Sequence, residues 1–571
     1  YGEWSALKNL KLTARVGITL KNDDSDVFKP ASHTDYASIQ TWDSNYANRG
    51  EYRKTSGKSV NLAVDAGVNY TLEKGVHMLF VNGTYSLTQT KSESYGTVAI
   101  GFPSDKLDFI TAGNSYSTSS KPTGSESTVN TVGFTAALNY SYDNRYLADA
   151  SWRANGSSQF GANQRFGYFW SAGLGWNVHN VAFMQNQEVV NLLKIRGSLG
   201  YTGSQNFGAY QAIPTYKYIT DSNYKGEIGM ILSGLANKDL QWQQQYDRNI
   251  GFDLTLFNRL SVRTDFYSNV TKDLLTDISV VPSTGFSTYK DNLGETINKG
   301  WQVGLNYRVY SQKDLYVNVS AGFLHNTNKV RKIADYLKAY NAAIDEQKDQ
   351  ITSSVSGASD ELLKMQRDPS TRYQEGQSLS AIWAVRSLGI DPVTGQEIFL
   401  KRDGNTTTTW SAADQVVCGD TEPKLSGNFG LNAGWRGLTV SLAFTFKLGG
   451  QMYNSTLVNK IENVDINNKN VDVRALTERW NTPGIETRFK GIADNSTTKS
   501  TSQFVEDLNE LVLSSVNVTY DLNQVIRKMP FENIRFTFNM SDIGRLSTMK
   551  QERGTAYPFA RTFSVGLTAD F

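Results

Sequence analysis

The sequence contains 571 residues, with 57 lysines and arginines against 55 aspartates and glutamates, and its formal net charge is +2. This balance excludes a protein that binds nucleic acid through a marked basic excess, so no nucleic-acid partner is expected. A single cysteine, Cys418, and four scattered histidines exclude an internal disulfide framework and a His/Cys metal site, so no cofactor is expected.

Alternation of apolar and polar residues is the dominant pattern along the chain. In 10–20, 60–72 and 438–448, even-numbered positions are apolar and odd-numbered positions are polar or small. This pattern predicts β-strands with one apolar face, long enough to cross a bilayer when tilted. No stretch of 18 apolar residues occurs, which excludes transmembrane helices but not a transmembrane barrel. The predicted strands are 10–20, 58–72, 76–89, 130–142, 145–155, 168–178, 192–202, 244–257, 260–271, 299–310, 314–327, 424–435, 437–448, 511–521, 533–542 and 559–571.

The connections between these strands alternate in length. The short and moderate ones are 73–75, 143–144, 179–191, 258–259, 311–313, 436–437 and 522–532. The others are mostly long, the longest being 328–423. This alternation is typical of outer-membrane barrels, whose short turns face the periplasm and whose long loops face outward. We therefore predict an all-β fold: a transmembrane, antiparallel, up-and-down β-barrel, with about 16 strands here, crossing the outer-membrane lipid many times.

Two other interpretations remain open from the pattern alone. Sixteen is an even number of strands, so they could close by themselves into a passive porin. A secreted, soluble, β-rich adhesin or lectin would also have alternating strands. An enzyme is not expected, because the sequence has no HExxH motif, no Walker loop and no Gly-x-Ser-x-Gly elbow in a strand–helix context. No catalytic, cofactor-binding or metal-binding residue is assigned.

Charged residues on the polar faces of the strands are candidates for the lumen of the barrel. They are Arg15, Asp65, Arg153, Arg196, Arg263 and Asp265. The simplest expectation is that these side chains pair across neighbouring strands or contact a plug. The residues that bind a substrate are not identified, because binding residues lie mostly in loops whose geometry the sequence does not fix.

Nine short stretches, in order along the chain, carry a resemblance to a known family. They are RYLADASWRANGSSQFG at 145–161, FGYFWSAGLGW at 166–176, LKIRGSLGYTGSQ at 193–205, DLQWQ at 239–243, KDLL at 272–275, NKGWQV at 298–303, GDTEPK at 419–424, RWNTPG at 479–484 and YPFARTFSVGLTADF at 557–571. Together they resemble SusC/RagA-type TonB-linked outer-membrane transporters. Residues 1–144 match that family only in their alternating pattern.

The resemblance implies a 22-strand barrel that is preceded by a plug domain and a TonB box, neither of which is recognised in this sequence. Residues 1–571 are therefore interpreted as one domain, the C-terminal part of such a barrel. About six strands would be missing, and Tyr1 is expected on the periplasmic side.

The resemblance also implies TonB-dependent uptake of oligosaccharide or peptide nutrients. A SusD-like surface lipoprotein would capture the nutrient above the long loops, and TonB would act through the missing plug. The long segments 328–423 and 449–510 are the expected lipoprotein contacts, on length alone. The last stretch resembles the signal by which the barrel assembly machinery recognises barrels; its residues on one face are Phe563, Val565, Leu567, Ala569 and Phe571.

Overall fold

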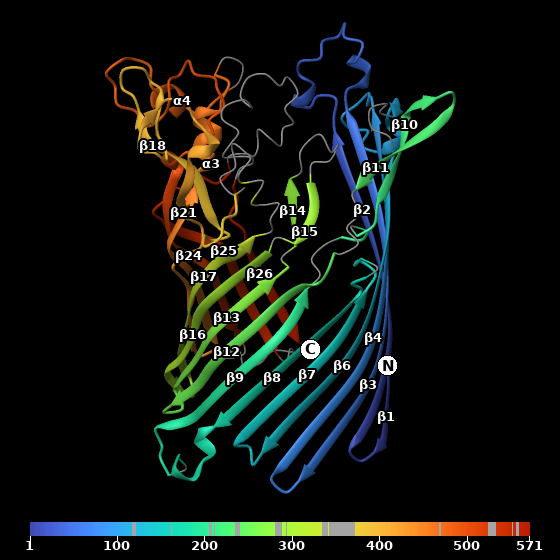
Figure 1. Cartoon of the computed structure of the whole chain (residues 1–571), viewed down its shortest axis with the longest axis vertical. Coiled ribbons are helices and arrows are strands. Elements are labelled where there is room, and N and C mark those ends of the chain that lie inside the picture. The colour runs from blue at the N-terminus through green and yellow to red at the C-terminus, as the bar shows by residue number, and fades with distance from the viewer. Residues whose placement is uncertain are drawn as a thin grey trace.

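One antiparallel sheet of 18 strands dominates the computed structural model of the chain. The structure describes residues 1–116, 122–161, 163–184, 186–204, 208–210, 212–234, 240–273, 275–279, 288–292, 294–333, 338, 341, 372–466, 470–522, 533–550, 552–554 and 559–570. Within these residues, no helix is long and apolar enough to cross a membrane. Strands make up the main body of the molecule (Figure 1).

The strands of the large sheet follow one another up and down along the chain. They are β1 (Gly2–Leu7), β2 (Leu10–Lys29), β3 (Glu51–Lys74), β4 (His77–Ile100), β5 (Ser115–Tyr116), β6 (Thr123–Tyr142), β7 (Tyr146–Ser157), β8 (Phe166–Asn177), β9 (Val190–Ser204), β12 (Gln243–Leu256), β13 (Leu260–Lys272), β16 (Gly294–Gln312), β17 (Leu315–Ile333), β22 (Leu425–Trp435), β23 (Leu438–Tyr453), β24 (Val505–Asp521), β25 (Asn533–Ser547) and β26 (Phe563–Asp570). All sixteen predicted strands are confirmed, and the fold is an all-β, antiparallel barrel wall.

Two strands of the sheet were not predicted. β5 has only two residues and pairs with the upper end of β4. β1 forms an antiparallel hairpin with β2, so that Gly2 lies opposite Ala14. The expectation that Tyr1 lies at the short-turn end is therefore wrong. β1 starts part-way up the wall, runs down to the turn at residues 8–9, and β2 then runs back up beside it (Figure 1).

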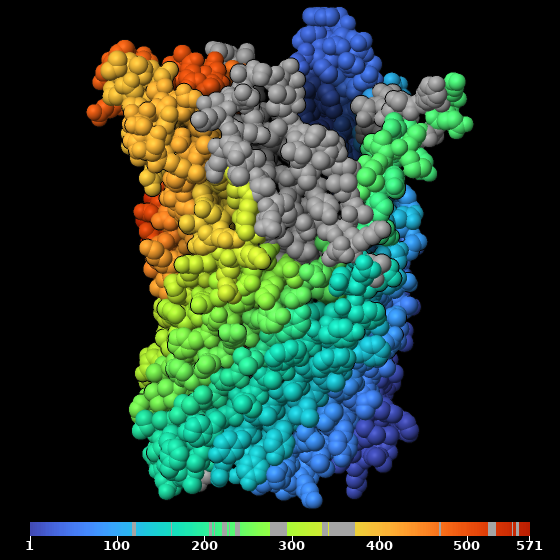
Figure 2. All heavy atoms as spheres, in the orientation of Figure 1, coloured from blue at the N-terminus to red at the C-terminus, as the bar shows by residue number. Residues whose placement is uncertain are grey.

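Register places the apolar residues of neighbouring strands side by side on the outer face of the wall. Val16, Val64 and Leu87 lie opposite one another across β2, β3 and β4. Along β2, Val16 is 64% exposed and Ile18 67%. A continuous apolar surface of this extent is unfavourable in water and suits lipid. In Figure 2, diagonal bands of colour follow the tilted strands across this closely packed wall.

The short turns are built from residues that adopt the left-handed conformation. Asp143 and Asn144 both have φ of 50°, and Arg436 (φ 45°) precedes Gly437 (φ 87°). Two consecutive left-handed residues form the type I′ turn that matches the twist of paired strands. These turns therefore join β6 to β7 and β22 to β23 with no spare length, and the turn between β6 and β7 is seen at the lower end of the wall (Figure 1).

The long connections carry smaller strands and helices at the upper end. The strands are β10 (Thr215–Tyr224), β11 (Glu227–Gly234), β14 (Leu275–Ser279), β15 (Thr288–Asn292), β18 (Ala381–Ile390), β19 (Glu397–Leu400), β20 (Thr406–Thr407) and β21 (Gln415–Asp420). The helices there are α3 (Ser455–Leu457), the π-helix Val458–Glu462, α4 (Arg474–Thr477) and the 3-10 turns Thr34–Tyr36, Tyr46–Asn48, Ile110–Ala112, Ala412–Asp414 and Ser502–Phe504. Two further 3-10 turns, Val178–Asn180 and Ala182–Met184, lie in the connection between β8 and β9 at the lower end of the wall.

Two of the long connections fold together into a module with its own core. The long-loop module comprises 372–420 and 454–504, with β18 at the centre of a sheet between β19 and β21. Its apolar core consists of Leu457, Val458, Ile461, Ala475, Phe489 and Phe504. Val385 on β18 donates its backbone N–H to the carbonyl of Ser500 at 3.1 Å, which joins the two connections. The module therefore stands as a packed unit above the wall.

The large sheet has two unpaired edges. β1 pairs only with β2, and β26 pairs only with β25, among the strands that the structure describes. A sheet that spans lipid must close, because unpaired backbone groups are costly there. The alternative of a porin that these strands close by themselves is therefore disfavoured, and so is a soluble adhesin, since the outer face is apolar.

Candidate functional site

The inner face of the wall carries a charged network across four neighbouring strands. Arg196 on β9 contacts Asp265 on β13 (Nη1 to Oδ1, 2.5 Å) and Asp253 on β12 (Nε to Oδ2, 3.3 Å). Arg263 approaches Asp253 and Asp265 at 3.7 and 3.6 Å, respectively. On β16, Gln302 donates to Asp265 at 3.2 Å. The sequence-based expectation that lumenal charges pair across strands is confirmed for this group.

Burial distinguishes the members of this network. Asp265 is 2% exposed, whereas the Arg263 side chain is 68% exposed and reaches into the lumen. A buried carboxylate is stable only when cations and hydrogen-bond donors compensate it. Asp265 therefore holds Arg196 in place, and Arg263 keeps most of its surface available to whatever occupies the lumen.

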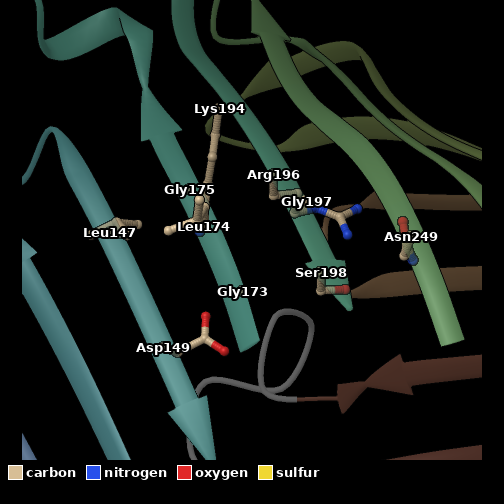
Figure 3. Close-up of a pocket in the computed structure, with 10 residues that line it drawn as sticks. All are labelled: Leu147, Asp149, Gly173, Leu174, Gly175, Lys194, Arg196, Gly197, Ser198 and Asn249. Atoms are coloured by element: carbon tan, nitrogen blue, oxygen red, sulfur yellow. The ribbon is translucent and has the colours of Figure 1, made fainter. Parts of the chain in front are cut away.

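A groove of about 180 Å³ opens beside this network on the inner face of β7, β8 and β9. Asp149 of β7 lies on one side of it, and Lys194 and Arg196 of β9 lie on the other (Figure 3). Between them, β8 contributes Gly173 and Gly175 as the floor. Among the described residues, neither Asp149 nor Lys194 has an ion-pair partner, so the groove offers one negative and one positive group.

Glycine on β8 makes room for the charged side chains of the groove. A Cβ atom at Gly173 would lie 2.6 Å from Oδ1 of Asp149, well inside any normal contact. A Cβ at Gly175 would lie 3.4 Å from Cε of Lys194 and 3.2 Å from Cβ of Leu147. The side chains of the flanking strands therefore lie over the bare backbone of β8, and the alternating glycines Gly173 and Gly175 are the sequence signal for this arrangement.

The other predicted lumenal residues lie elsewhere on the wall. Arg15 on β2 lies opposite Asp65 on β3 in register. Arg153 on β7 donates from Nε to the Oδ1 atom of Asn155 at 2.6 Å. These three residues lie away from the groove, so alternation identified their face correctly but did not indicate which of them share a site.

The predicted assembly signal lies on the edge strand β26. Phe563, Val565 and Leu567 are 68%, 59% and 70% exposed on the outer face, and Ala569 is partly buried. Opposite them in register are outward-facing apolar residues of β25, such as Phe538 beside Val565. Phe571 lies outside the described residues. The role of this face in assembly stays a prediction.

The long-loop module contains a second group of buried charges. Glu462 is 2% exposed and accepts hydrogen bonds from the backbone N–H of Lys490 (3.1 Å) and the hydroxyl of Thr498 (2.7 Å). Arg479 is 1% exposed and donates to backbone carbonyls, including that of Gly491 at 2.7 Å. Burial raises the pKa of the Glu397 carboxyl to about 7. Glu462 and Arg479 therefore bond neighbouring segments of the module together, and no local pattern in the sequence indicated this group.

Arg474 joins the module to the connection between β25 and β26. Arg474 contacts both carboxylate oxygens of Glu552, at 2.6 and 2.8 Å, and also Asp472 at 2.7 Å. A bidentate arginine–carboxylate contact is among the stronger and more directional polar interactions. The connection between β25 and β26 is therefore fixed to α4.

Comparison with known proteins identifies the family of this chain. The family model for the TonB dependent receptor-like beta-barrel matches residues 2–354, more than half of the chain. The chain belongs to this family. Barrels of this family lie in the outer membrane, which agrees with the apolar outer face of the wall.

Individual relatives agree with this assignment. TonB-dependent receptor P3 of Formosa agariphila is 24% identical over 478 residues, which cover 80% of this chain and 45% of that protein. TonB-dependent receptor SusC of Bacteroides thetaiotaomicron is 31% identical over 211 residues, or 35% of this chain and 21% of that protein. The chain thus spans about half the length, or less, of the curated relatives it matches.

A solved structure shares the fold of the whole chain. The structure of the RagAB peptide transporter superimposes with a TM-score of 0.80 at 22% identity, and the match covers 100% of this chain and 61% of that one. The wall and its upper module therefore have the architecture of a SusC/RagA-type TonB-dependent barrel.

Proposed function

We propose that this chain is the C-terminal wall of a TonB-dependent outer-membrane importer for oligosaccharide or peptide nutrients. The observation that carries the proposal is the contrast between the two faces of one sheet. The outer face is apolar where it meets lipid, and the inner face carries the Arg196–Asp265 network and the open groove beside it. A polar, hydrated inner wall is what a conduit for large polar solutes requires.

The partners in this proposal follow from the family and from the two unpaired edges. Further strands of the same transporter would pair with β1 and β26, and a plug would occupy the lumen against residues such as Arg263. TonB would act on that plug, and a SusD-like surface lipoprotein would sit on the long-loop module. The relatives named SusC and RagAB support this arrangement. We expect transport and no enzymatic step.

The faces of the wall also support a proposal for assembly. We place the signal for the barrel assembly machinery on Phe563, Val565, Leu567, Ala569 and Phe571, with residues 1–571 acting as one wall domain. Replacing Phe571 with Ser should lower the amount of folded protein in outer-membrane fractions. An Asp570→Asn variant changes the neighbouring side chain on the other face and should leave that amount unchanged.

Growth on defined nutrients tests the transport function. Cells that lack the gene should fail to grow on one oligosaccharide or peptide mixture, and the wild-type gene should restore growth. In cells without TonB, the same nutrient should not be taken up even when the protein is present. Uptake that persists without TonB, together with a steady open-channel conductance of the purified protein in planar bilayers, would instead establish the passive porin.

A further inference from the structure

A row of basic side chains occupies the lipid-facing surface of the wall near its long-loop end. The basic patch consists of Arg248 on β12, Lys272 on β13, Lys299 on β16 and Lys329 on β17. All four side chains are exposed. In a wall whose outer face is largely apolar, four cations on four adjacent strands require an explanation, because charges facing lipid are costly away from the interface.

Register shows that these residues face outward and not into the lumen. Arg248 lies between Tyr246 and Ile250 on the same face of β12, and Ile250 is 67% exposed on the apolar outer surface. Ser268 lies opposite Arg248 on one side and opposite Lys299 on the other, which puts these two cations in one row. Neighbouring strands are about 4.8 Å apart, and β13 lies between β12 and β16. The backbones of Arg248 and Lys299 are therefore about 10 Å apart, so both side chains can reach one phosphate.

The aromatic residues nearby mark the level of the patch. Tyr201 and Tyr246 pack with ring centroids 4.8 Å apart, and Trp301 neighbours Lys299 on the outer face of β16. Such aromatic residues gather where the hydrocarbon of the membrane meets its headgroups. The ammonium of Lys272 lies 5.2 Å from the centroid of the Tyr246 ring, and Arg248 is two residues from Tyr246 on the same face, so these cations lie close to this level on either side of it. The patch therefore faces lipid headgroups on the external side.

The charges of the patch are available for a ligand. Among the described residues, none of the four cations has an ion-pair partner. Glu295, which lies opposite Lys272 in register, is already held by Arg331 at 2.5 Å. Lys272 interacts electrostatically with the adjacent Asp273, yet four cations above an apolar wall still complement a molecule with phosphate groups and acyl chains.

We propose that the basic patch binds the phosphorylated headgroup of an outer-leaflet lipid, whose acyl chains lie along the apolar surface of β12, β13, β16 and β17. Arg248 and Lys299 hold one phosphate between them, and Lys272 and Lys329 lie closer to the outside, where they contact further anionic groups of the headgroup. This inference rests on the place of the wall in the outer membrane and is independent of the proposed transport function.

Native mass spectrometry of the full-length protein in detergent tests the proposal. The probes are lipid A that carries its phosphates and the same lipid A after their removal. Wild-type protein should retain the phosphorylated lipid at least about thirtyfold more tightly than the dephosphorylated lipid, since Arg248 and Lys299 near the headgroup contribute about 1 kcal/mol each. The Arg248→Gln/Lys299→Gln double variant should lose about this factor.

A matched double variant provides the control. Arg259 and Lys313 are exposed on the short turns of the same two hairpins, at the opposite end of the wall. Arg259→Gln/Lys313→Gln removes the same charges and should bind lipid like wild type. Equal losses in the two variants would overturn the proposal, as would equal binding of the two lipids by wild type. Displacement of the lipid by excess inorganic phosphate would assign the patch to free phosphate instead.

Assembly of the variants is followed by the heat-dependent mobility of folded barrels on gels. If the Arg248→Gln/Lys299→Gln variant does not assemble, the wild-type comparison of the two lipids still decides the proposal. Loss of growth on a nutrient is not used as the readout, so failure of the transport function and failure of lipid binding are distinguished.

Discussion

Glu397 makes the stability of the long-loop module dependent on pH. One carboxylate oxygen of Glu397 is buried with no hydrogen-bond partner. Burial is the main cause that raises its pKa from 4.5 to about 7; Glu462 raises it further, while Ser387, Thr501 and Lys490 oppose the rise. Below pH 4.5 the group is neutral in both the folded and the open module. Above pH 7 it is charged in both, and the folded module has to accommodate a buried charge.

The magnitude follows from linkage. Between pH 4.5 and pH 7 the open module releases a proton that the folded module keeps, so the free energy of opening falls as pH rises. A shift of this size corresponds to about 3 kcal/mol, lost progressively over that window. Glu397→Gln keeps the shape of the neutral acid and removes the charge. It should leave the module unchanged at pH 4 and stabilise it at pH 8 by up to about 3 kcal/mol.

Hydrogen exchange of the module measures this free energy directly. The backbone N–H of Val385, bonded to the carbonyl of Ser500 across the two connections, is a suitable probe of opening. Wild-type protection, corrected for intrinsic exchange, should fall between pH 5 and pH 8, whereas protection in Glu397→Gln should stay level. Glu486→Gln changes an exposed carboxylate of the same module and should follow wild type. Parallel profiles for wild type and Glu397→Gln would refute the reasoning.

Three further substitutions test the wall and its connection to the module. Asp265→Ala leaves lumenal arginines without their buried carboxylate and should destabilise the barrel by about 3 kcal/mol in urea unfolding. Arg474→Ala breaks the contact with Glu552 and should speed protease cleavage in the connection between β25 and β26, with the barrel itself intact. Leu305→Arg places a charge on the lipid-facing side and should cost about 2–4 kcal/mol, whereas Asn306→Arg on the lumenal face should cost far less.

The sequence by itself determined the strands and their faces. Alternation is a local property, so the lipid-facing rows of β2, β3 and β23 follow from the apolar residues at every second position. The short turns follow as well, because Asp143, Asn144 and Gly437 readily adopt the left-handed conformation that such turns require. These features place the chain in a membrane barrel before any coordinates are known.

The ends of the strands were underestimated for a physical reason. The strand predicted at 10–20 extends to Lys29, and the one predicted at 58–72 begins at Glu51. Above the membrane both faces of a strand are in water, so alternation fades while backbone pairing continues. The strand β1 also escaped detection, because its six residues are ordered by pairing with β2.

Only the tertiary structure decided which residues meet. Alternation put Arg196 and Asp265 on the same face, but they become a pair only through the register of β9, β12 and β13, whose sequences are far apart. The long-loop module was predicted only as two long connections, and its core joins residues from both of them. Such contacts depend on packing between distant segments, which no local pattern encodes. The sequence therefore determines a wall with two faces, and the fold determines the sites on each.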